Sequence, residues 1–254
     1  MKQPKIVLLN RKIGQPDTHL PSSSISHPIF CGQNPLDTQN PSSYTPTVKK
    51  QCLVKSKNKT TFSKIAIIDI DNTLWQFSDH FYLELRKINS NFPTPDQWST
   101  FDTWKGYCSE VDFISAINSI HHNQDSDRHK PYPESRGFLS SLKEHGFHII
   151  LASHRVPEMR QPTERWLTHH RLPYDELHLS LDKTVLFPMA DVVVDDAPPT
   201  LEKAIKIGAR GAGLLFPWNR AYAGNGFVLF QNLNEVLDYI LKSSSRSCLS
   251  IVRK

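Results

Sequence analysis

Residues 65 to 73 read Ile-Ala-Ile-Ile-Asp-Ile-Asp-Asn-Thr, so that an apolar run ends on two carboxylates, Asp69 and Asp71. A run of Ile with Ala is typical of a strand that is buried on both faces of a parallel sheet. Open α/β sheets bind their ligands at the carboxyl ends of such strands. Because an unpaired buried carboxylate is costly, the pair predicts a bound cation or a chemical role at this edge.

A simple turn or a calcium-binding loop could also place two acids here. Asp71-Asn72 could end the strand in an Asx turn. A calcium-binding loop of the EF-hand type needs Gly at its sixth position and Glu at its twelfth, whereas counting from Asp69 gives Leu74 and His80. The calcium loop is therefore disfavoured even more than the turn, and the choice between a turn and a site depends on the rest of the chain.

Three later segments supply matching groups in chain order. Residues 147 to 153, Phe-His-Ile-Ile-Leu-Ala-Ser, form a second buried-strand pattern that ends on the Ser153 hydroxyl. Lys183 follows, and residues 191 to 196, Asp-Val-Val-Val-Asp-Asp, form a third short strand that ends on two more acids. Each group alone is weak evidence, but the ordered set predicts a phosphoryl-transfer site.

With these four motifs the chain resembles the haloacid dehalogenase superfamily of phosphotransferases, over residues 64 to 242. The superfamily motifs are Asp-x-Asp-x-Thr, Ser or Thr, Lys, and an acidic pair. The stretch 182–185, Asp-Lys-Thr-Val, with the acidic pair at 195–196, is similar to the 5'(3')-deoxyribonucleotidase branch. Two departures leave the substrate open: Asn-Thr at 72–73 replaces the usual Gly-Val or Gly-Thr, and His-Arg at 154–155 replaces Ser-Pro.

The chemistry of these residues, which matches what the resemblance implies, predicts hydrolysis of a phosphate monoester. Asp69 would attack phosphorus and form an aspartyl-phosphate. Asp71 would protonate the leaving alkoxide and then deprotonate the attacking water. Lys183 would neutralise charge, while Ser153 and Thr73 would hold phosphate oxygens.

A dianionic phosphate is repelled by Asp69, so the site is expected to need Mg²⁺, which takes oxygen ligands. The expected protein ligands are the Asp69 carboxylate, the main-chain carbonyl of Asp71, and the acidic pair Asp195 and Asp196. Which member of the pair binds the ion directly stays open. A magnesium-dependent reaction at the sheet edge is therefore predicted.

A small helical cap is expected to close over the site. Residues 76–131 are too long for a βα turn and carry helical patterns near 78–89 and 110–121. Most aromatic rings of this segment should form the core of the cap. Phe77 and Trp104 stand where the deoxyribonucleotidase pattern has aromatic residues, so the resemblance implies that they stack on a nucleobase.

Three further features have open interpretations. Arg155 could bind a second anionic group of the substrate or could be a surface arginine. His121, His122 and His129 suggest zinc, but we interpret them as part of a polar loop leaving the cap, since no Cys or second close pair completes a site. The Pro-Trp-Asn turn at 217–219 could border the site, although such turns are more often structural.

The expected fold is α/β: a doubly wound, Rossmann-like parallel sheet with helices on both faces and the cap inserted after the first motif strand. Helices are predicted at 137–145, 198–207 and 233–241. Short strands at 211–216 and 227–230 should complete the sheet.

Residues 1–60 differ from the rest in composition. They hold 7 of the 18 Pro, and 9 Lys or Arg against 2 Asp or Glu, a net charge of +7, which leaves −2 for the remainder of the chain. We therefore predict a disordered, basic, Pro- and Ser-rich tail before a hydrolase domain at 61–254. The tail could be a transit peptide, an arm that contacts nucleic acid or an anionic surface, or a solvated extension.

The number and spacing of cysteines and the hydropathy of the chain limit the cellular compartments that are expected. The 4 Cys residues lack metal-ligand spacing, which favours a reducing compartment. No apolar run approaches the roughly 20 residues of a membrane-spanning helix. A cytoplasmic protein without membrane contact is expected, or a mitochondrial or plastid protein if the tail is a transit peptide; the oligomeric state stays open.

The expected partner is a small phosphorylated substrate, a nucleotide or a similar compound. One alternative is a magnesium-dependent phosphatase that acts on protein or sugar phosphates, a branch that Thr-Leu-Trp at 73–75 also resembles. The other is an inactive binding module with the same fold. The complete motif set disfavours the inactive module, because loss of activity usually begins with loss of Asp69 or its partners.

Overall fold

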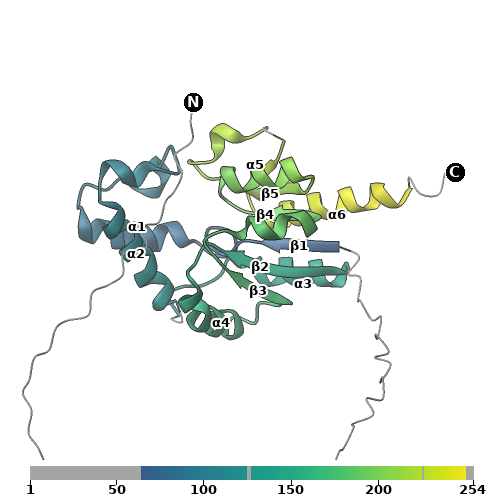
Figure 1. Cartoon of the computed structure of the whole chain (residues 1–254), viewed down its shortest axis with the longest axis horizontal. Coiled ribbons are helices and arrows are strands. Elements are labelled where there is room, and N and C mark those ends of the chain that lie inside the picture. Colours follow the sequence, from purple (N-terminus) through teal and green to yellow (C-terminus); the bar gives the residue numbers. More distant parts are fainter. Residues whose placement is uncertain (1–63, 125–126, 225, 250–254) are drawn as a thin grey trace, which may run out of the picture. The chain divides into compact units, whose positions relative to one another are not determined.

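The computed structural model describes residues 64–124, 127–224 and 226–249, and the expected tail at 1–60 lies outside them. The described residues form a six-stranded sheet in the order β3-β2-β1-β4-β5-β6, with every neighbouring pair parallel (Figure 1). The strands are β1 (Lys64–Ile68), β2 (Phe147–Ser153), β3 (Glu176–Leu179), β4 (Val192–Val194), β5 (Arg210–Leu214) and β6 (Val228–Phe230). The expected parallel α/β fold is confirmed.

Helices cover both faces of this sheet. They are α1 (Phe77–Ile88), α2 (Glu110–His122), α3 (Ser135–Glu144), α4 (Arg160–His169), α5 (Pro198–Ile207) and α6 (Leu233–Leu249). Helix α5 contacts β4 and β5, whereas α3 contacts β2 and α6, and α6 contacts β5 and β6. Along β1 the buried side chains alternate, because Ala66 and Ile68 belong to the larger core and Ile67 to the core under α5.

The central position of β1 sets the place of the site. In the sheet register Ile68 lies beside Leu151 of β2 and Val194 of β4. The chain order reverses at this point, since β1 is followed in the sheet by β2 on one side and by β4 on the other. Residues that follow β1, β2 and β4 therefore reach the same sheet edge, where open α/β sheets bind ligands.

Helices α1 and α2 of the expected cap pack against each other, beside the sheet in Figure 1. Their bounds lie within one residue of the predicted patterns. Ser109 caps α2, and its hydroxyl accepts the Asp112 N–H at 3.2 Å. One expectation was wrong: His121 and His122 are the last two residues of α2 and not part of a loop.

Two elements were not predicted. Helix α4 has Pro162 in its first turn and a mostly polar sequence, and β3 is a short edge strand on which Glu176 is exposed. Helix α6 also runs further than the predicted 233–241.

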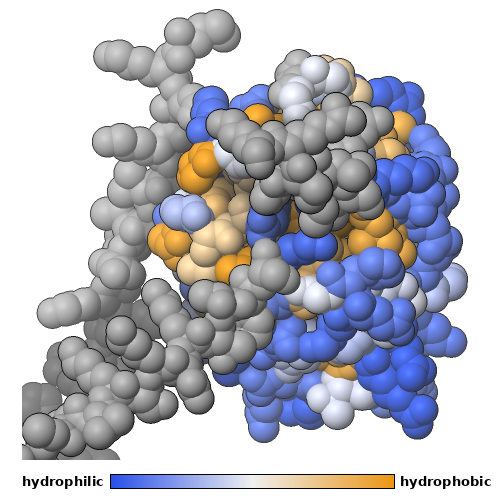
Figure 2. Space-filling view, turned by 90° about the vertical axis from the view of Figure 1, so that its right-hand side faces the viewer, coloured by the Kyte–Doolittle hydropathy of each residue, from blue (hydrophilic) through white to orange (hydrophobic). Residues whose placement is uncertain are grey.

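Most apolar side chains are inside the two cores, and the surface in Figure 2 is largely hydrophilic with smaller hydrophobic patches. Among the described residues, none of the helices combines the length and the apolar character needed to cross a bilayer.

Candidate active site

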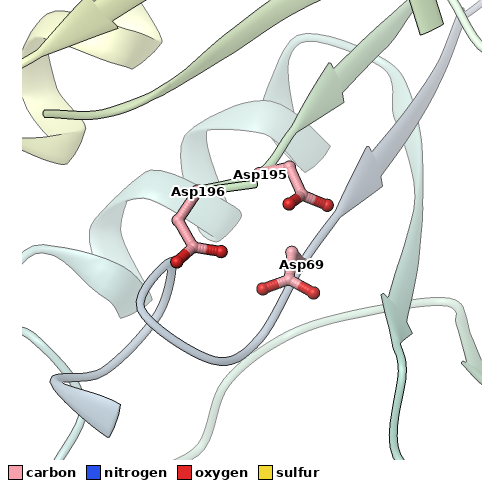
Figure 3. A group of neighbouring side chains, drawn as sticks. All are labelled: Asp69, Asp195 and Asp196. Carbon is pink, nitrogen blue, oxygen red and sulfur yellow. The ribbon is translucent and has the colours of Figure 1, made fainter. Parts of the chain in front are cut away.

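Three carboxylates from two strands meet at the carboxyl edge of the sheet. Asp69 follows β1, and its N–H donates to the Val194 carbonyl at 2.9 Å. Asp195 and Asp196 follow β4, and the Asp195 N–H donates to the Ala212 carbonyl at 3.1 Å. One oxygen of each acid lies within 4.8 Å of the other two (Figure 3). Sheet pairing therefore fixes the backbone that presents this cluster.

The cluster carries an excess of negative charge. Asp69, Asp195 and Asp196 are 5%, 1% and 6% exposed. Burial raises the pKa of Asp69 to about 7 and raises the pKa of Asp196 well above its usual range, and the Asp195 charge adds to both shifts. Lys183 Nζ lies 2.5 Å from Asp69 Oδ1 and 2.6 Å from Asp195 Oδ2. One ammonium thus faces three carboxylates.

A divalent cation fits this arrangement. Carboxylate oxygens are the ligands that Mg²⁺ prefers, and buried acids are normally paired with a cation. Asp69, Asp195 and Asp196 would hold such an ion. Within the described part of the chain no other group of three His, Cys, Asp or Glu side chains has comparable geometry, so the histidines near His121 form no metal cluster there.

The four predicted catalytic residues come together. Asp69, Asp71, Ser153 and Lys183 all line one cavity of about 270 Å³. Ser153 ends β2 and is 2% exposed, and its hydroxyl donates to Asp71 Oδ2 at 3.3 Å. Lys183 begins a 3-10 segment, Lys183–Met189, and is 1% exposed. The motif spacing therefore identified side chains that are neighbours in space.

Asp71 is not one of the three clustered acids and lies in a polar network of its own. Its Oδ1 accepts the Trp75 indole N–H at 2.9 Å and Arg155 Nη2 at 2.6 Å. Its Oδ2 accepts Arg155 Nε at 3.1 Å and lies 3.1 Å from His121 Nε2. Burial favours the protonated acid, but Arg155 and then His121 outweigh it and hold the pKa of Asp71 well below its usual range.

Of the two expectations for Arg155, the structure contradicts the surface arginine. The side chain is 2% exposed, so it is not a surface arginine. Its guanidinium donates to Asp71, to Thr163 Oγ1 at 2.9 Å and to Gln124 Oε1. Arg155 also lines the cavity, so its contact with a second anionic group of the substrate stays a prediction. In this structure Arg155 holds the Asp71 carboxylate through two hydrogen bonds.

Sequence reasoning missed His121 and Gln124, which bring the end of α2 to the site. His121 is 4% exposed and lines the cavity, and Gln124 is 0% exposed. A signal was present, because Phe113, Ile117 and His121 follow one another at intervals of four and so share one face of the helix. Burial lowers the pKa of His121, although the nearby Asp71 opposes the shift.

Asn72 accounts for one departure from the deoxyribonucleotidase pattern. Its φ is 57°, in the left-handed region that favours Gly and that Asn tolerates better than most residues. Its side-chain amide donates to Asp196 Oδ2 at 3.1 Å, and its Oδ1 accepts the Ser78 N–H at 2.8 Å. Asn therefore keeps the turn that Gly allows and adds a link between the acidic pair and α1.

The cavity is polar at the carboxylates and aromatic toward the cap. Phe77 and Trp104, the two rings predicted to stack on a base, both line it. Each already packs on another ring: Phe77 lies 5.2 Å from Phe81, and Trp104 lies 4.1 Å from Phe113, centroid to centroid. Thr73 is buried but is not a lining residue, so its expected contact with phosphate has no support.

The fold is that of haloacid dehalogenase-like hydrolases and phosphatases. A haloacid dehalogenase-like hydrolase from Streptococcus pneumoniae superposes with a TM-score of 0.51 at 14% identity, over 70% of this chain and 98% of that one. A "predicted phosphatase" from Clostridium acetobutylicum gives a TM-score of 0.51 at 17% identity, over the same shares of the two chains. This confirms the fold that the motif resemblance predicted.

The chain is also similar in sequence to a protein with a more specific name. The Chlorobaculum tepidum protein named "Putative 5'(3')-deoxyribonucleotidase" is 28% identical over 171 residues, which cover 61% of this chain and 79% of that protein. No family model matches the chain.

Proposed function

We propose that the protein is a phosphatase of the haloacid dehalogenase type that hydrolyses a small phosphate monoester. The observation that carries this proposal is the meeting of Asp69, Lys183, Asp195 and Asp196 at the sheet edge, beside Asp71. A nucleophile, a neutralising cation and a proton carrier thus line one cavity. An inactive binding module would need none of these groups in register.

In the first step an Asp69 oxygen attacks phosphorus, and the bond between phosphorus and the ester oxygen breaks. The leaving alkoxide takes a proton from Asp71. In the second step water attacks the aspartyl-phosphate, its proton passes to Asp71, and Asp69 is released with inorganic phosphate. The proton that Asp71 gains from water is the one it gives to the next leaving group.

The ionised Asp71 of this structure has the form needed to accept that proton. Arg155 and His121 favour the carboxylate, whereas an arriving dianionic phosphate would favour the protonated acid. Lys183 would offset charge on the transferring group, and Ser153 would donate to one of its oxygens. Asp69, Asp195 and Asp196 would hold Mg²⁺, together with the Asp71 carbonyl as the motif resemblance implies. When bound, the ion would supply further positive charge to offset that of the phosphate.

A nucleotide or a similar small phosphate is the substrate class that we propose. The aromatic lining offers flat apolar faces to a ring, which suits a nucleobase better than a sugar. The name of the Chlorobaculum tepidum relative points to the same class. A cavity of about 270 Å³ also suits a small molecule better than a phosphorylated protein segment.

Release of inorganic phosphate from a panel of nucleotides and sugar phosphates tests the proposal. Asp69→Asn should abolish release while the far-ultraviolet circular dichroism stays unchanged, and excess EDTA should remove activity that Mg²⁺ restores. Asp238→Asn is the matched control, because Asp238 is 67% exposed and pairs with Lys242 far along the chain from the motifs. Activity of Asp69→Asn near the wild-type rate would eliminate the nucleophile assignment.

A further inference from the structure

One ring of the cavity comes from the sheet side and not from the cap. Trp218 follows β5, lines the cavity and is 4% exposed. Its neighbour Asn219 fixes the turn, since the Asn219 amide donates to the Leu214 carbonyl at 2.9 Å and to the Asp196 carbonyl at 3.1 Å. The position of Trp218 is therefore tied by its backbone to one of the three clustered acids.

The Trp218 ring is also held by its neighbours. It stacks on Phe216, with centroids 4.4 Å apart and planes 5° from parallel. The Trp218 ring also contacts Trp98 of the cap segment, another lining residue, with ring centroids 5.9 Å apart. A ring fixed on two sides has little freedom to turn, so it can orient a ligand at low entropic cost.

The indole N–H of Trp218 is buried and has no hydrogen-bond acceptor among the described residues. Other buried indoles of this protein do have one. Trp75 donates to Asp71 at 2.9 Å and Trp166 to the His129 carbonyl at 2.5 Å, and the half-buried Trp98 donates to the Pro93 carbonyl at 2.9 Å. A buried donor without an acceptor is unfavourable, and one that lines a ligand cavity is satisfied if the ligand brings the acceptor.

We infer that Trp218 is a specificity-determining residue whose N–H donates to an acceptor atom on a planar ring of the leaving group. The inference rests on the proposed phosphatase function and names its substrate class more closely. The ring would lie among the aromatic side chains, and a carbonyl oxygen or ring nitrogen at its edge would accept the bond. Rings without such an acceptor would leave the indole N–H unsatisfied and would be cleaved less efficiently.

Two matched substrates and two matched variants test this. The substrates are thymidine 5'-monophosphate and its analogue in which difluorotoluene replaces thymine, a ring of similar shape with much weaker acceptors. Trp218→Phe removes the free N–H and keeps a ring. Trp98→Phe is the control, because it makes the same change at a lining tryptophan whose N–H is already bonded within the cap segment.

The readout is the ratio of kcat/KM for the two substrates. The wild type and Trp98→Phe should prefer thymidine 5'-monophosphate by roughly 3- to 10-fold, the size of a typical net hydrogen bond, and Trp218→Phe should bring the ratio close to one. An unchanged ratio in Trp218→Phe would overturn the inference. So would a wild type that does not distinguish the two substrates, a comparison that requires no variant to fold.

Failure of the inference and failure of the proposed function differ. Asp69-dependent hydrolysis of monoesters that carry no planar ring, with no cleavage of any nucleotide, refutes the role of Trp218 alone. If no monoester is cleaved, the proposed function fails, and calorimetric binding of thymidine 5'-monophosphate to the wild type and to Trp218→Phe still reports on the indole. Equal affinities in that measurement would refute the inference as well.

Discussion

The charge imbalance around Asp69 predicts a stability that depends on pH and on a cation. Burial raises the pKa of Asp69 from 3.8 to about 7 in the folded chain, whereas an unfolded chain keeps the ordinary value. Between these two values the folded state binds more protons than the unfolded state, so stability falls as pH rises. A shift of about 3 units corresponds to a loss of about 4 kcal/mol, complete above pH 7.

Urea unfolding in EDTA, repeated from pH 4 to pH 8, measures this loss. The neutral side chain of Asp69→Asn cannot ionise, so its stability relative to the wild type should rise by up to about 4 kcal/mol over that interval. Mg²⁺ should stabilise the wild type at pH 8 and have little effect at pH 4, where the raised pKa values of Asp69 and Asp196 keep these two acids protonated. It should stabilise Asp69→Asn less, since one ligand is gone.

Asp238→Asn provides the baseline, because the exposed Asp238 lies outside the cluster. A stability difference between Asp69→Asn and the wild type that stays constant with pH would refute the reasoning, since it would mean that Asp69 ionises normally in the folded state. An effect of Mg²⁺ that is equal at pH 4 and pH 8 would contradict the assignment of the ion to these acids.

Two further changes have expected outcomes. A Cβ on Gly213 would lie 2.1 Å from the Asp195 carbonyl oxygen, so Gly213→Ala should displace Asp195 and lower the free energy of unfolding by about 3 kcal/mol or more. The control is Gly137→Ala in α3, where a Cβ meets nothing within 4 Å. In the same urea assay this variant should be neutral or stabilising by up to about 1 kcal/mol. Arg155→Met should raise the pKa of Asp71, which moves the acidic limb of the pH profile of kcat upward, and should cost about 3 to 5 kcal/mol of stability; an unmoved limb would exclude Arg155 as the partner of Asp71.

The strands that carry the site were predictable because of where they lie. β1, β2 and β4 are central strands that are mostly buried, so each contains a run of apolar residues, and a polar residue that ends such a run marks the sheet edge. β3 lies at the edge of the sheet and α4 is mostly polar, so neither gives a strong periodic signal.

The predicted positions of Ser153 and Lys183 followed from the same logic, since neighbouring parallel strands end together. The contacts of Arg155 did not. Its partners Asp71, Gln124 and Thr163 come from three separate segments, and nothing local in the sequence distinguishes a buried Arg from an exposed one. The contacts of Arg155 could be predicted only if the position of α2 relative to the sheet edge were already known.

That same meeting has a consequence for the proton carrier. Asp71 and Arg155 follow β1 and β2, whereas His121 belongs to α2 of the expected cap. Any displacement of α2 would move His121 from Asp71 but would leave Arg155 beside it, since β1 is paired with β2 along the whole length of β1. Arg155 has the larger influence on the pKa of Asp71. Arg155, which follows β2, would therefore determine most of the pKa shift of Asp71, and the position of the cap would change only the smaller part that comes from His121.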